Sequence, residues 1–96
     1  MREITSHAER LGVNVAIEPV NRFEGYAGFM NSVSEAVDVI GSIGSDRLGL
    51  LADFFHINIE DGPLTETLRG AGEHLMHIHL ADSNRQIPGT GHLDFS

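Results

Sequence analysis

The 96-residue sequence contains no cysteine and no lysine. Without cysteine, disulfides, thiolate metal sites and cysteine nucleophiles are excluded, and a cytoplasmic location is the default expectation. All six basic residues are arginines, so Schiff-base chemistry on lysine is excluded as well. No apolar run approaches the roughly 18 residues that span a bilayer, so we expect no membrane partner.

Basic residues are also scarce, with 6 of them against 14 acidic ones, which gives a formal net charge of −8. No basic cluster interrupts this acidic character. Such a surface repels phosphate backbones, so nucleic acid is not an expected partner. The excess of carboxylates fits a plain acidic surface, and it also fits attraction of a cation.

The residues that are present alternate between helical and strand-like segments. Helices are expected over residues 2–11, 33–42 and 63–71, the second of them behind a capping box of Ser32 and Glu35. Strands are expected over residues 13–17, 48–52 and 75–80, and loops over 19–31, 54–62 and 81–96. The continuous apolar run of the second strand is typical of a parallel strand buried on both faces. This order predicts an α/β fold of parallel strands with right-handed crossovers.

Each expected strand ends in a residue that can bind metal, namely Glu18, Asp53 and His79. The carboxyl ends of parallel strands meet at one edge of a sheet, so we expect these side chains to lie side by side. Two carboxylates and one imidazole suit a hard to borderline divalent ion such as Mn²⁺, Mg²⁺ or Co²⁺. Either carboxylate alone fits a solvated group or a helix cap, and a lone histidine fits a satisfied polar residue, so the prediction depends on all three. His77 shares a strand face with His79 and is either a polar surface residue or a support for that ligand.

The loops after the strands contribute further polar groups, which are Glu24, His56 and Arg85. The planar fork of donors on Arg85 can orient a substrate rich in hydroxyls or phosphorylated. Aromatic side chains that can form apolar walls for a sugar are Phe23, Tyr26 and Phe55.

Three segments together resemble motifs of the xylose-isomerase-like sugar isomerase and epimerase superfamily. They are residues 17–24 (IEPVNRFE), 51–60 (LADFFHINIE), and 77–85 (HIHLADSNR) with 88–92 (PGTGH). They look closest to the branch that contains D-tagatose 3-epimerase and related ketose 3-epimerases. The resemblance implies a partial (β/α)₈ TIM barrel forming one domain over residues 1–96. Its three βα units resemble strands 5 to 7 of the full barrel.

The resemblance also implies roles for the residues. It makes Glu18, Asp53 and His79 ligands of a Mn²⁺-type ion, and it places Glu24, His56 and Arg85 against a sugar substrate. Glu18 becomes one of two glutamates that move a proton at the carbon beside the sugar carbonyl, through an enediolate.

The chain departs from this family in its length, because a full barrel needs about 250 residues. The fourth metal ligand, a glutamate that is also the second acid–base group, is expected beyond Ser96. The 96 residues are therefore expected to be inactive by themselves. Two unpaired strand edges and an exposed inner face favour a homo-oligomer.

Three alternatives remain open from the sequence. An inosose dehydratase-like lyase on the same scaffold suits the third motif equally well. A second alternative is that the chain is a catalytically inert piece of a barrel that folds only as an oligomer. A metal-dependent nuclease on the related endonuclease IV barrel fits least, because the acidic charge argues against it.

Overall fold

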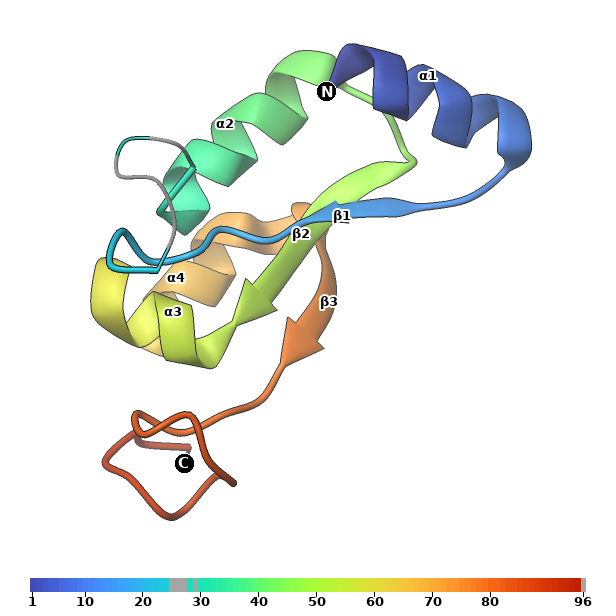
Figure 1. Cartoon of the computed structure of the whole chain (residues 1–96). Coiled ribbons are helices and arrows are strands. Elements are labelled where there is room, and N and C mark those ends of the chain that lie inside the picture. The colour runs from blue at the N-terminus through green and yellow to red at the C-terminus, as the bar shows by residue number, and fades with distance from the viewer. Residues whose placement is uncertain (25–27, 29, 96) are drawn as a thin grey trace.

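The computed structural model describes residues 1–24, 28 and 30–95. The helices are α1 (Arg2–Leu11), α2 (Val33–Ile43), α3 (Phe54–Glu60) and α4 (Leu64–Ala71), with a 3₁₀ turn η1 (Gly72–His74) after α4. The strands are β1 (Val15–Ile17), β2 (Leu48–Asp53) and β3 (Leu75–His79). Together they form one parallel sheet in the order β1-β2-β3 (Figure 1). The prediction of an α/β fold with three parallel strands is confirmed.

The central strand β2 carries the core. Its residues Leu48, Gly49, Leu50 and Ala52 are buried, as the continuous apolar run predicted. Helix α2 packs beside it, and α4 packs against α2 and α3. The core also receives Ala36, Ile40, Ile57 and Ala71. The edge strand β3 is different, because its residues 76–79 are exposed. Within the described residues, β1 and β3 each pair only with β2, so each leaves one edge unpaired.

Helix α2 begins at the capping box that the sequence predicted. The Ser32 side chain accepts a hydrogen bond from the Glu35 main-chain N–H, and the Glu35 carboxylate accepts one from the Ser32 N–H. The Val33 N–H donates to the carboxylate of Asp61 at 3.1 Å. At its other end the helix stops at Gly44, whose φ of 71° is in the left-handed region.

The loop predicted over residues 54–62 is wrong in its first part, because residues Phe54–Glu60 form α3. This seven-residue helix is too short to be stable through its own hydrogen bonds. It is stabilised by Asp53, which accepts a hydrogen bond from the Phe55 N–H at 2.9 Å, and by burial of Phe54, His56 and Ile57. The strand therefore leads directly into a helix, and His56 lies in its first turn.

The other predicted elements agree with the structure to within two residues at each end, which is the usual uncertainty of helix and strand boundaries. Strand β1 is shorter than expected at its start, and Pro63 precedes α4 as its N-cap. Among the described residues, no helix combines the length and apolar character that crossing a membrane requires.

Candidate metal and substrate site

Glu18, Asp53 and His79 meet at the carboxyl edge of the sheet. Asp53 and His79 are partners in the register of β2 and β3, and Glu18 directly follows β1. The Nδ1 atom of His79 lies 3.7 Å from Oε2 of Glu18 and 3.6 Å from Oδ2 of Asp53. Ligands that each lie about 2.1 Å from one ion are separated by roughly 3–4 Å, so this spacing suits a shared cation.

The two carboxylate oxygens of Asp53 have different neighbours. Oδ1 accepts the hydrogen bond from Phe55 that caps α3, whereas Oδ2 is the oxygen near His79. The side chain is only 12% exposed. The helix cap thus fixes the carboxylate and leaves one oxygen directed at the site, as supporting hydrogen bonds commonly do for metal ligands.

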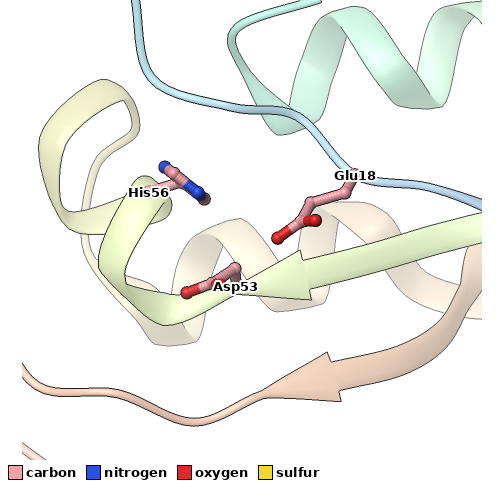
Figure 2. A group of neighbouring side chains, drawn as sticks. All are labelled: Glu18, Asp53 and His56. Atoms are coloured by element: carbon pink, nitrogen blue, oxygen red, sulfur yellow. The ribbon is translucent and has the colours of Figure 1, made fainter. Parts of the chain in front are cut away.

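A second imidazole lies beside the same two carboxylates. Glu18, Asp53 and His56 each offer a donor atom within 4.8 Å of the others. Figure 2 shows Glu18, Asp53 and His56 as neighbouring side chains, with His56 projecting from α3. His56 is buried, whereas His79 is half exposed. His79 approaches each carboxylate through Nδ1, whereas the three residues whose donor atoms all lie within 4.8 Å of one another are Glu18, Asp53 and His56.

Glu24 and Arg85 form an ion pair across 61 positions of sequence, with 2.5 Å between Oε1 and the guanidinium. Arg85 lowers the pKa of the Glu24 carboxyl, and a hydrogen bond from Asn21 lowers it further. The Arg85 guanidinium lies 4.9 Å from the centre of the Phe55 ring, a cation–π distance. His56 Nδ1 lies 3.9 Å from Glu24 Oε2, so the structure also gathers the three predicted substrate residues.

The remaining predicted side chains lie in different settings. Phe55 packs beneath Arg85, whereas Phe23 is 82% exposed. Tyr26 lies outside the described residues. The ring of His77 meets that of His79 edge to face, with 5.3 Å between the ring centres.

Two polar residues that the sequence reasoning passed over are fully buried here, Asn21 and Asp82. Asp82 accepts hydrogen bonds from the N–H groups of Ser83, Gly89 and Leu93 at 2.7, 2.8 and 3.0 Å. These bonds, that from Leu93 foremost, hold the pKa of the Asp82 carboxyl far below its usual range. Asp82 therefore ties together the loop that carries Arg85. The turn-forming residues around Asp82 indicate a loop in the sequence, but no sequence pattern indicates that the N–H groups of Gly89 and Leu93 would donate to its side chain.

Comparison with known proteins places this geometry in context. The family described as a xylose isomerase-like TIM barrel matches residues 1–96. D-psicose 3-epimerase of Enterocloster bolteae is 38% identical over the whole chain, and 3-dehydro-D-guloside 4-epimerase of Escherichia coli is 34% identical over 99% of it. These matches cover 31% and 36% of the two relatives, so the chain spans about a third of their length.

A solved structure gives the same picture in three dimensions. The crystal structure of D-psicose 3-epimerase with D-tagatose from Clostridium cellulolyticum H10 superposes with a TM-score of 0.87 at 36% identity. The superposition covers 96% of this chain and 31% of that one. The three strands and their helices thus match part of an epimerase TIM barrel.

Proposed function

The chain belongs to the xylose isomerase-like TIM barrel family, and we propose that it forms part of a divalent-metal-dependent active site that epimerises a ketose or related sugar. The observation that carries the proposal is the convergence of Glu18, Asp53 and His79 at the ends of three adjacent strands. The relatives described above are epimerases, which favours epimerisation over the dehydratase alternative.

In this proposal Glu18, Asp53 and His79 hold the metal ion. Two carboxylates and one imidazole form a donor set that suits Mn²⁺, with Mg²⁺ and Co²⁺ as alternatives. When bound, such an ion supplies Lewis acidity toward a carbonyl and its neighbouring hydroxyl. The oxygen of Asp53 that α3 leaves unused supports this assignment, because it is already directed at the site.

Glu18 has a second task in the proposal, which is proton transfer. Its carboxylate takes the proton from the carbon beside the sugar carbonyl and leaves an enediolate. Return of a proton to the opposite face of that carbon inverts its configuration. That return needs a second acid–base group, which the resemblance predicts to be a glutamate outside these 96 residues.

Glu24, His56 and Arg85 bind the sugar in this proposal. Glu24 is held ionised by Arg85 and accepts hydrogen bonds from hydroxyls, while Arg85 donates them. Because Arg85 rests on the Phe55 ring, its fork has a fixed plane in which to meet the substrate.

Calorimetric titration with Mn²⁺ tests the metal site. We expect binding by the chain, and loss of that binding in Glu18→Gln and Asp53→Asn. Glu73→Gln is the matched control, because Glu73 lies in η1 at the opposite end of the sheet and its change removes the same charge. Equal Mn²⁺ affinity in Glu18→Gln and Glu73→Gln would overturn the assignment.

Proton exchange tests the chemistry without requiring a complete epimerisation. In the chain joined to the remaining strands of the barrel, which supply the second acid–base group, we expect Mn²⁺-dependent incorporation of deuterium from D₂O at C3 of D-psicose or D-tagatose, as followed by NMR. Glu18→Gln should abolish the exchange, since it removes the base. Exchange that persists in this variant contradicts the role of Glu18.

We further propose that the chain self-associates through its sheet edges. The outer strands leave hydrogen-bonding groups unpaired, and Met76, Ile78 and Leu80 are exposed on and beside β3. Sedimentation velocity should detect a species larger than 10.4 kDa at high concentration, and a compact monomer throughout would count against the proposal. We also propose a cytoplasmic location, which is the default expectation for a sequence without cysteine.

A further inference from the structure

Asn21 is a buried amide, 1% exposed, in the loop that follows β1. Its Oδ1 accepts a hydrogen bond from the main-chain N–H of Phe23 at 3.0 Å. A main-chain N–H can only donate, so this bond determines which end of the amide is oxygen. The NH₂ group must therefore be on the other side, where it donates to Glu24 Oε2 at 2.9 Å and lies 2.8 Å from His56 Nδ1.

The orientation of this amide decides which ring nitrogen of His56 carries the proton. Nδ1 of the ring faces the NH₂ group of Asn21 at 2.8 Å and the Asn21 main-chain N–H at 3.3 Å. Both neighbours are donors, so Nδ1 must be an acceptor and cannot carry a proton. A neutral imidazole with an unprotonated Nδ1 carries its proton on Nε2.

We infer that Asn21 is a positioning residue that holds His56 as a hydrogen-bond donor through Nε2–H. Rotating the amide cannot reverse this arrangement, because the NH₂ group would then face the Phe23 N–H and Oδ1 would face the Glu24 carboxylate. The inference rests on the proposed function for what His56 donates to, which is an oxygen of the sugar.

This assignment separates the roles of the two histidines beside Glu18 and Asp53. An imidazole binds a metal through an unprotonated nitrogen. In His56 one nitrogen accepts from Asn21 and the other carries the proton, so its ring is not available as a ligand despite its short distances. Within the described residues no hydrogen-bond donor faces Nδ1 of His79, which stays the proposed third ligand.

The same amide also restrains Glu24, so Asn21 connects two of the three proposed sugar contacts. Replacement by Asp keeps the shape of the side chain but removes both N–H donors. A carboxylate there would repel Glu24 and would face Nδ1 of His56 with an acceptor in place of a donor, which favours the tautomer with the proton on Nδ1. Asn21→Asp thus changes the chemistry of the site with little change in volume.

The direct test is a long-range ¹H–¹⁵N correlation spectrum of the chain labelled with ¹⁵N-histidine, with His56 assigned from His56→Gln. We expect an unprotonated Nδ1 and a protonated Nε2 for His56 in the unaltered chain. A proton on Nδ1 would overturn the inference, and this result needs no substituted protein.

In Asn21→Asp we expect the His56 ring to gain a proton on Nδ1. Asn58→Asp is the control, because it adds the same charge at an exposed position of α3 two residues from His56, and it should leave the tautomer unchanged. A His56 pattern in Asn21→Asp that matches the control would refute the role of Asn21.

Metal titration separates this inference from the proposed function. We expect His56→Gln to bind Mn²⁺ within about threefold of the unaltered chain, and His79→Gln to lose roughly tenfold or more. The opposite ranking would make His56 the ligand and overturn the inference. If even the unaltered chain binds no Mn²⁺, the proposed metal site fails, and the tautomer spectrum alone decides the inference.

Discussion

Asp53 and His79 are paired residues of adjacent parallel strands, and their side chains approach to 3.6 Å between Oδ2 and Nδ1. Each side chain lies on the last residue of its strand. The register of the sheet thereby places a carboxylate and an imidazole together although 26 positions of sequence separate them. The same residue Asp53 also starts α3, so the proposed ligand and the helix cap are one side chain.

Asp53 should therefore separate metal binding from helix capping. Asp53→Asn keeps an oxygen that can accept from the Phe55 N–H, so we expect stability to change little while Mn²⁺ affinity falls roughly tenfold or more. Asp53→Ala should lose that affinity and also about 1 kcal/mol of unfolding free energy. Calorimetry and urea unfolding measure the two effects. Equal stability of the Asn and Ala variants would contradict the capping role.

Ser32 should contribute measurable stability through the capping box of α2. Ser32→Ala removes the acceptor for the Glu35 N–H, and we expect a loss of about 1 kcal/mol in urea unfolding. Glu35→Gln serves as the control, because glutamine can still accept from the Ser32 N–H. A loss in Glu35→Gln as large as that in Ser32→Ala would mean that charge, not capping geometry, is the cause.

Replacing Gly49 by alanine should lower the stability of the fold, whereas replacing Gly41 by alanine should raise it. A Cβ on Gly49 would lie 2.8 Å from Cβ of Met76 on the neighbouring strand, so Gly49→Ala should cost about 1–3 kcal/mol. A Cβ on Gly41 in α2 meets nothing within 4 Å, so Gly41→Ala should gain about 0.5–1 kcal/mol. Urea midpoints measure both. A neutral Gly49→Ala would show that β2 and β3 can separate without cost.

Asp82 should make the stability of its loop depend on acid. Main-chain hydrogen bonds lower the pKa of the Asp82 carboxyl in the folded chain, whereas an aspartate in the unfolded chain has a pKa of about 3.9. The carboxylate therefore stabilises the fold fully above that unfolded value, and its contribution declines as the pH falls below about 4 toward the folded pKa. Urea unfolding between pH 7 and pH 3 should show this decline.

Asp82→Asn tests the cause of that decline. The amide offers one acceptor oxygen in place of two, so the variant should be less stable than the unaltered chain at pH 7, and the difference should narrow at pH 3. Asp38→Asn, at an exposed position of α2, should differ by less than about 0.5 kcal/mol at both pH values. A constant deficit in Asp82→Asn across the range would exclude the carboxylate's titration as the cause.

The sequence by itself determined the features that depend on local physics. The capping box at Ser32 and the buried run of β2 are readable because their hydrogen bonds and apolar patterns involve neighbours in the chain. It also predicted that Glu18, Asp53 and His79 would meet. That prediction needed only the rule that parallel strands joined by helices have their carboxyl ends at one edge.

Only the tertiary structure decided what distant side chains do to one another. Helix α3 was predicted as a loop because its seven residues are stabilised by a cap and by burial, and not by their own propensity. The ring nitrogen of His56 that carries the proton depends on the amide of Asn21, 35 positions away, and no local pattern in the sequence reveals this contact. Distances and the directions of donors and acceptors arise when the chain packs, so the neighbours that surround the rings of His56 and His79 could not be read from the sequence.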